Sequence, residues 1–371
     1  MRHVPPLLIA LSILANTPLR ASTPPRIVVT VARSAHAGPL TGRLVLAIAK
    51  AARPEPRLLL SPRGPALFAI DIDGLTPGAP AVIDGQSLGY PRQLGELPPG
   101  DYFAQAIVNV YELVHRADGT SIWVHMNDGS VEFFNNAAGH RPRKRIRHTS
   151  GVDVRRLSAP DRDHAQPDPI DFTRYQMTNI YTDSNAFTVP SGPFTSVERG
   201  FQRTTDGQTV ITTRELSRFE AVLGSHGRSG YQLEAWEAIY GPVGADGYPV
   251  PLWDKLTGRI DHAVASSMRD SGYDLRAFAE RRWPQIGAQL VGKLHFSAGD
   301  MDDYWLNLAV YRFQDFLKTT ANPHYEEDFV YGRPMKGHAW HSDTWANFIR
   351  NVAAAIKAAA PAGENTAAWS Y

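Results

Sequence analysis

Two short loops near the C-terminus of this 371-residue chain carry residue types that can move a proton. The first, Gly299–Tyr304 (GDMDDY), follows a segment that the pattern predicts to be a strand, and the second, Lys336–His341 (KGHAWH), follows another. An acid after one strand and a histidine after the next allow a carboxylate to orient an imidazole and stabilise its cation. The imidazole can then remove a proton from a serine hydroxyl. The sequence therefore predicts an acid–base pair built from these two loops.

Asp302 is the first choice for the acid, because it lies three residues after Gly299 and begins the turn into a predicted helix. Asp300 is the second choice. An aspartate in front of a helix is also often only an N-cap, which contributes about 1 kcal/mol of helix stability. That alternative stays open for Asp302 and for Asp303.

His338 is preferred over His341 as the base, because Gly337 in front of it permits a tight turn that brings the ring forward. A histidine between a glycine and a tryptophan is also often a packed side chain, and this interpretation stays open too. A metal site is disfavoured, because His-x-x-His is poor helical spacing for two ligands. Its ligands would be His295, His338, His341 and Asp343.

The elements that must position these loops alternate between helix and strand. The hydrophobic pattern predicts helices over residues 217–223, 231–240, 261–268, 275–282, 304–317 and 345–359, and strands over 290–297 and 327–331. The last helix has Phe348, Ile349, Val352 and Ile356 on one face. A chain that ends strand–helix–strand–helix is typical of an open α/β sheet, which keeps its chemistry in loops outside the carboxyl ends of its strands.

The preceding part of the chain, residues 26–157, is predicted to be all-β. Strands are expected over residues 26–32, 43–47, 66–73 and 102–113, with Pro- and Gly-containing turns between them. Short strands at this spacing are typical of an immunoglobulin-like β-sandwich. Polar residues 158–169 are predicted to be a linker, residues 170–360 a second domain and residues 361–371 a tail.

The N-terminal residues 1–21 are predicted to be a signal peptide. Arg2 provides a positive start, Leu7–Ala15 is an apolar run, and the small Ala21 precedes the expected cleavage point. The run is much shorter than the roughly 20 residues of a membrane-spanning helix. We therefore expect a secreted or periplasmic protein without a membrane span.

Composition limits the other classes of function. The 38 Lys and Arg residues nearly balance the 37 Asp and Glu residues, so nucleic acid is not expected as a partner. The chain has no Cys, which excludes disulfides, Cys-ligated zinc and thiol catalysis. The basic run Arg141–Arg147 (RPRKRIR) has no flanking aromatics and is interpreted as a solvated loop. No cofactor is predicted.

Five stretches of the chain resemble a known family. They are FAIDIDGLTPGAPAVID (68–84), LPPGDYFAQAIVNVYE (97–112), PDPIDFTRYQMTNIYTDSNAF (167–187), VLGSHGRSGYQLEAWEAIYGPVGADGYP (222–249) and LVGKLHFSAGDMDDYWLNLAVY (290–311). In these the chain is similar to secreted esterases of the α/β-hydrolase type, related to enterochelin-esterase-like proteins, with a β-sandwich ahead of the hydrolase domain. The resemblance implies a serine carboxylic-ester hydrolase fold in which Asp302 and His338 are two members of the catalytic triad.

The nucleophilic serine, the third member of that triad, is not found in the sequence. The resemblance implies that the family's nucleophile elbow lies between the sandwich and Pro167, yet no G-x-S-x-G occurs in the chain. The nearest approach, Gly227–Tyr231 (GRSGY), ends in tyrosine, and the resemblance places it in a different loop, so Ser229 is interpreted as structural or rim-lining. We therefore expect an incomplete α/β-hydrolase domain with weak or no esterase activity; the alternative is a non-catalytic module that binds a carbohydrate or glycoconjugate.

The absence of the segment that carries the family's leading strands and nucleophile elbow also leads us to expect partners. Loss of the leading strands of a mostly parallel sheet leaves an open edge and uncovered apolar helix faces. A second copy of the chain is expected to pair through that edge, and a small ester or glycoconjugate is the expected ligand.

Overall fold

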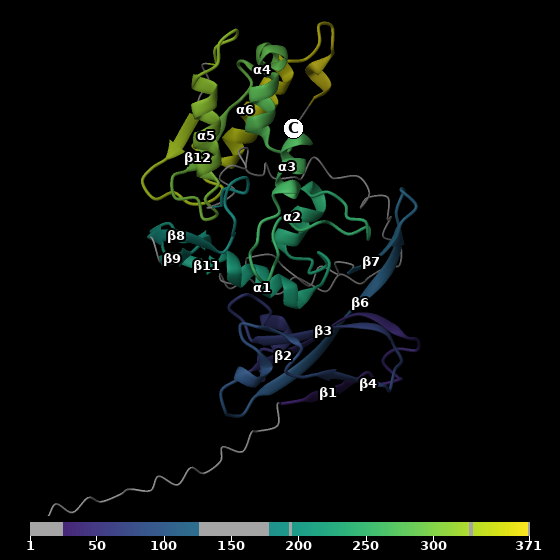
Figure 1. Cartoon of the computed structure of the whole chain (residues 1–371). Helices are drawn as coiled ribbons and strands as arrows, with labels where there is room; N and C mark the ends of the chain where they lie inside the picture. The colour runs from purple at the N-terminus through teal and green to yellow at the C-terminus, as the bar shows by residue number, and fades with distance from the viewer. Residues whose placement is uncertain (1–24, 126–177, 193–194, 326–328, 370–371) are drawn as a thin grey trace, which may run out of the picture.

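The computed structural model describes residues 25–125, 178–192, 195–325 and 329–369. Within them the strands of the N-terminal region lie at one end of the molecule and the C-terminal helices lie at the other (Figure 1). The described residues thus combine α-helices with antiparallel sheets. The predicted signal peptide, the basic run 141–147 and the linker 158–169 lie outside them.

A five-stranded antiparallel sheet dominates the N-terminal region. Its strand order is β5 (Leu88–Tyr90), β3 (Ala66–Leu75), β2 (Leu40–Ala49), β6 (Phe103–His115) and β7 (Ser121–His125). A separate antiparallel pair is formed by β1 (Ile27–Thr30) and β4 (Pro80–Ile83). All four strands predicted from the sequence of this region overlap strands of the structure. The immunoglobulin-like arrangement stays a prediction.

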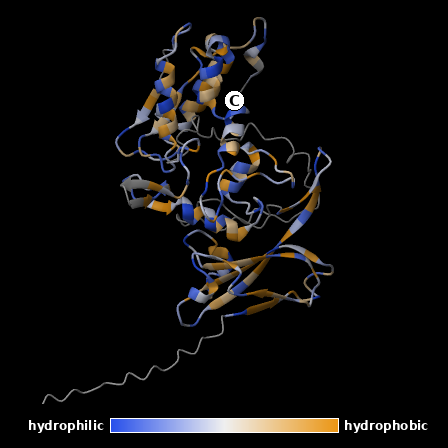
Figure 2. Cartoon of the chain, in the orientation of Figure 1, coloured by the Kyte–Doolittle hydropathy of each residue, from blue (hydrophilic) through white to orange (hydrophobic). Residues whose placement is uncertain are grey.

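The central strand β2 is buried almost throughout, because both faces of the sheet are covered. Much of the N-terminal sheet is hydrophobic, coloured orange in Figure 2. On one face Leu44 and Leu46 pack with β1 and β4. On the other face Val45 and Ala47 join a cluster that includes Phe219 of helix α1 (Thr213–Leu223). Burial on two faces explains why β2 reads as a continuous apolar run rather than an alternating one. The sheet therefore shares a core with the helices that follow.

Two hairpins and three helices form the middle of the described chain. The hairpins are β8 (Thr188–Gly192) with β9 (Thr195–Glu198), and β10 (Gly200–Arg203) with β11 (Thr209–Thr212). The helices are α1, α2 (Gln232–Tyr240) and α3 (His262–Asp270), close to their predicted positions. The sequence pattern did not predict these four strands, because their segments TVPSG, TSVE, GFQR and TVIT contain few apolar residues and show no clear alternation.

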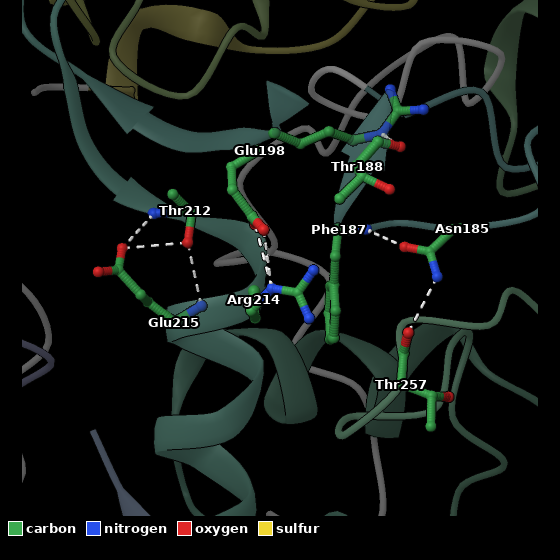
Figure 3. Close-up of polar contacts among 9 residues, drawn as sticks. Asn185, Phe187, Thr188, Glu198, Thr212, Arg214, Glu215 and Thr257 are labelled. Atoms are coloured by element: carbon green, nitrogen blue, oxygen red, sulfur yellow. Dashed lines mark hydrogen bonds and ion pairs between the residues drawn. The ribbon is translucent and has the colours of Figure 1, made fainter. Parts of the chain in front are cut away.

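The start of α1 is set by local hydrogen bonds (Figure 3). The Thr212 hydroxyl accepts from the Glu215 backbone N–H at 3.1 Å, and the Glu215 carboxylate accepts from the Thr212 backbone N–H at 2.8 Å. This reciprocal capping box satisfies two backbone donors at once. Arg214 then pairs with both carboxylate oxygens of Glu198, at 3.0 and 3.2 Å, which ties α1 to β9.

The C-terminal region contains a parallel strand–helix–strand unit. Strands β12 (Phe296–Gly299) and β13 (Phe329–Gly332) pair in parallel, and α5 (Asn307–Lys318) connects them. Helix α4 (Leu275–Leu290) precedes this unit and α6 (Trp345–Ala358) follows it. Three short 3-10 helices complete the described elements: Pro56–Leu59, Leu94–Glu96 and Thr366–Ala368. An α/β-hydrolase assignment for this region stays a prediction.

Two predicted boundaries in this region are wrong. The strand expected over 290–297 begins only at Phe296, because α4 continues through Pro284 to Leu290 and anchors itself through the buried Trp283. The helix expected from Tyr304 begins at Asn307 instead. Trp305 has a left-handed φ of +66°, which interrupts the helical backbone in front of α5.

None of the helices that the structure describes combines the length and the apolar character needed to cross a lipid bilayer.

Candidate active site

The two predicted loops leave the same edge of the β12–β13 pair. Gly299 and Gly332 are the last residues of the two parallel strands and are paired with each other, so the two loops begin side by side. A Cβ on Gly299 would lie 2.2 Å from the Lys336 carbonyl oxygen and 2.3 Å from that of Gly337. Because only a glycine permits this approach, Gly299 allows the loop that carries His338 to pack directly onto the end of β12.

The structure brings Asp302 and His338 together. Asp302 Oδ2 lies 2.9 Å from His338 Nδ1, and the side chains are 9% and 31% exposed. The other carboxylate oxygen, Oδ1, accepts from the backbone N–H groups of Tyr304 at 2.9 Å and Leu306 at 3.1 Å. One carboxylate oxygen of Asp302 thus stabilises the turn before α5, whose N-cap is Leu306 and not Asp302, and the other contacts the imidazole; the role of Asp302 as the catalytic acid stays a prediction.

The side chains of the two neighbouring aspartates join the loops, because each accepts a hydrogen bond from a backbone N–H of the loop that carries His338. Asp300 Oδ1 accepts from the Lys336 N–H at 3.0 Å, and Asp303 Oδ1 accepts from the His338 N–H at 3.3 Å. Asp300, the second choice for the acid, thus does not contact the imidazole. His341 lies away from the pair, with its ring centroid 4.4 Å from that of Trp345. It is a packed side chain.

Arg203 is a site residue that the sequence analysis missed. Its Nε donates to the Asp302 carbonyl at 2.9 Å, and its backbone N–H donates to the Asp303 carbonyl at 2.8 Å. Its guanidinium also lies 3.7 Å from the centre of the Trp305 ring. Arg203 is 7% exposed and holds the acid loop by its backbone. No sequence signal identifies it, because it ends a short hairpin strand about 100 residues before the loop.

The carboxylate changes the titration of the imidazole. The hydrogen bond that Asp302 accepts from the ring raises the pKa of His338 above its ordinary value of 6.5, although partial burial acts in the opposite direction. A raised pKa in the folded state means that this contact stabilises the protein fully below pH 6.5. The stabilisation is lost as the pH rises through the pKa of the folded protein.

Asp302→Asn is expected to lower the pKa of His338 to 6.5 or below, because the charged acceptor is lost while burial remains. Nuclear magnetic resonance titration of the His338 ring protons would measure this. Asp315→Asn, an exposed aspartate on α5, is the matched control and should leave the His338 titration unchanged. A variant at position 302 that titrates like the wild type would show that the Asp302–His338 hydrogen bond does not form in solution.

No described residue supplies a nucleophile to this pair. None of the side-chain hydroxyls in the described ranges lies within hydrogen-bonding distance of His338 Nε2. Ser229 is 2% exposed, and its Oγ accepts from the Tyr231 N–H at 3.1 Å, so it is structural. The Tyr304 ring is edge-on to His338 at 5.0 Å, and burial raises the pKa of Tyr304 to about 12, which keeps its hydroxyl protonated at neutral pH.

The described part of the chain contains no group of three or more His, Asp or Glu side chains arranged to hold a metal ion. Comparison with protein-family models, curated proteins and solved structures found no match to this chain.

Proposed function

We propose that this protein is an esterase-like hydrolase of reduced activity, in which His338 acts as a general base on water. The observation that carries this proposal is the 2.9 Å hydrogen bond between Asp302 Oδ2 and His338 Nδ1. With a proton on Nδ1 facing the carboxylate, Nε2 is the ring nitrogen left to accept another proton. The His338 side chain is 31% exposed, so solvent can reach it.

The proposed reaction has no acyl-enzyme intermediate. A water molecule attacks the ester carbonyl carbon and transfers a proton to Nε2, and the charge that develops on the imidazole is stabilised by Asp302. The carbon–oxygen bond to the leaving group then breaks, and the imidazolium returns its proton to the departing alkoxide. The products are a carboxylic acid and an alcohol. General-base assistance of this kind contributes about 10²–10⁴-fold, so hydrolysis should be slow.

The absence of a serine partner at His338 within the described residues supports the low rate. In serine hydrolases the oxyanion hole includes a backbone N–H next to the nucleophile, so loss of the elbow removes both features together. The resemblance to secreted esterases is consistent with this proposal. On the basis of this resemblance we also propose that an α/β-hydrolase domain follows a β-sandwich in the chain, and that the protein is secreted or periplasmic.

Hydrolysis of 4-nitrophenyl acetate tests the role of His338. We expect slow hydrolysis by the wild type, with no initial burst of nitrophenol. The rate should rise with pH through a pKa above 6.5, and it should be about a hundredfold lower in His338→Ala. His36→Ala, which removes an exposed histidine of the N-terminal region, is the control for unspecific hydrolysis by surface imidazoles.

Two results would contradict the proposal. Equal rates for the wild type and His338→Ala would remove His338 from the reaction. A burst of nitrophenol together with labelling by a serine-reactive phosphonate would show that a nucleophilic serine exists and that the protein is a complete serine esterase.

A further inference from the structure

The β10–β11 hairpin lies against both loops of the candidate site. Gln202, on β10, donates from its side-chain amide to the Tyr304 hydroxyl of the acid loop at 3.3 Å. On the other loop, a Cβ added to Gly337 would lie 3.0 Å from the methyl group of Thr205, in the turn of the hairpin. The hairpin thus contacts the segment before α5 and the segment that carries His338. It is therefore an element that can fix where the two loops lie.

Two buried side chains hold the backbone of the acid loop. Arg203, at the end of β10, donates from Nε to the Asp302 carbonyl at 2.9 Å and from its backbone N–H to the Asp303 carbonyl at 2.8 Å. Asn307, the first residue of α5, donates from Nδ2 to the Asp300 carbonyl at 3.1 Å. The two side chains also bind each other, because Arg203 Nη2 donates to Asn307 Oδ1 at 3.3 Å. We call this arrangement the Arg203–Asn307 clamp.

The acid loop depends on such a clamp, because its backbone is strained. Trp305 has a φ of +66°, in the left-handed region that residues other than glycine rarely adopt. A residue in this conformation persists only where the surrounding structure holds it. The Arg203 guanidinium covers the Trp305 ring, at 3.7 Å from its centre. Loss of the clamp would allow the loop to relax, and the Asp302 carboxylate would move with its own backbone.

The Arg203 guanidinium contributes geometry rather than a direct ion pair. The side chain is 7% exposed, and its acceptors among the described residues, the Asp302 carbonyl and the Asn307 amide oxygen, carry no charge. Burial of a cation without a carboxylate partner costs stability. The guanidinium supplies a planar fork that fixes two acceptors in direction, which the ammonium group of a lysine cannot do.

We propose that Arg203 and Asn307 are positioning residues that hold Asp302 Oδ2 at hydrogen-bonding distance from His338 Nδ1. Both act through Asp302, whose carboxylate stabilises the imidazolium that forms when Nε2 takes a proton. The effect of the clamp on hydrolysis rests on the proposed function. Its effect on the titration of His338 rests only on the 2.9 Å contact between the two side chains.

Arg203→Lys and Asn307→Ala test the clamp by nuclear magnetic resonance titration of the His338 ring protons. Lysine keeps the charge and loses the fork, and alanine removes both hydrogen bonds of the Asn307 side chain. In each variant the pKa of His338 should fall toward 6.5, because the contact with Asp302 is lost. The rate of 4-nitrophenyl acetate hydrolysis on its high-pH plateau should fall by about tenfold, with little change in KM.

Arg43→Lys is the matched control. Arg43 on β2 is also buried, at 5% exposure, and it also donates to backbone carbonyls, those of Val222 at 3.0 Å and Ala221 at 2.9 Å. Its replacement should lower stability in urea unfolding, as Arg203→Lys does, and leave the His338 titration and the plateau rate unchanged. A fall in the pKa of His338 in this control as well would assign the effect to general loosening of the fold and overturn the proposal.

Two further results would also overturn it. One is a wild-type titration of His338 in folded Asn307→Ala, a variant that keeps every charge and places a good helix former at the start of α5. The other is a wild-type titration in Arg203→Lys together with a higher pKa of His338 in Arg203→Met, which would show that Arg203 acts only through its charge. The titration does not depend on catalysis. A lowered pKa of His338 in the clamp variants, with hydrolysis that His338→Ala does not slow, supports the clamp and contradicts only the proposed function.

Discussion

Replacing Gly299 with alanine is expected to lower the free energy of unfolding by about 3 kcal/mol and to separate His338 from Asp302. The added methyl group would lie 2.2 Å from the Lys336 carbonyl oxygen and 2.3 Å from that of Gly337. Both obstacles are backbone atoms, so no side-chain rotation can relieve the overlap. The loop after β13 must move as a whole, and it carries the imidazole with it.

Two measurements check this prediction. Urea unfolding gives the loss of stability, and nuclear magnetic resonance titration should show the pKa of His338 falling toward 6.5 as the contact with Asp302 is lost. Gly85→Ala is the control, because a Cβ at that position meets nothing within 4 Å. A Gly299→Ala protein with wild-type stability and titration would mean that the two loops do not pack as the structure describes.

Glu220→Ala is expected to lower the free energy of unfolding by about 4 kcal/mol. The Glu220 carboxylate is fully buried and accepts from the backbone N–H groups of Leu233 at 2.8 Å and Glu234 at 3.0 Å, in the first turn of α2. Alanine would leave both donors unpaired in the core, at about 1–3 kcal/mol each, and would open a cavity beside them. Chemical unfolding measures the effect.

The same carboxylate should make stability depend on pH. Burial raises the pKa of Glu220 well above its ordinary value of 4.5, and the neighbouring Glu234 raises it further, whereas Lys255 acts in the opposite direction. Above pH 4.5 the unfolded chain therefore releases a proton that the folded chain still holds. It follows that the contribution of Glu220 to stability decreases as the pH rises from 4.5 through the pKa of the folded state.

Glu220→Gln separates this effect from the loss of the acceptor. The amide oxygen can still accept one backbone hydrogen bond, and it cannot titrate, so the decrease in stability with rising pH should become shallower. Glu112→Gln, at an exposed position of β6, should leave the pH profile unchanged. A Glu220→Gln protein with the full wild-type pH dependence would assign the effect to other groups, of which the buried Glu237 is the nearest candidate.

Local patterns in the sequence were informative about elements that carry runs of apolar residues, including the four-residue strands β1 and β13. The N-terminal strands and α1 to α3 were predicted from runs of apolar, β-branched and aromatic residues. The capping residues Thr212 and Asp261 did not enter that prediction, and α1 begins at Thr213, four residues before its predicted start. Asp302 and His338 were also predicted from a local pattern, because each follows a strand in a loop of distinctive composition. The hairpins β8 to β11 were missed, since their strands contain few apolar residues and show no clear alternation.

The chain's residue order was thus sufficient to predict Asp302 and His338 as a candidate pair, together with most of the elements around them, because those predictions depend on neighbours a few positions away. The folded structure was needed to show that Asp302 meets His338 rather than only capping a turn, that Arg203 holds the acid loop, and that the apolar side chains of α6 stay exposed. These features depend on groups that are far apart in the chain or on whether a face is covered. Packing of distant segments decides them, and no local pattern records it.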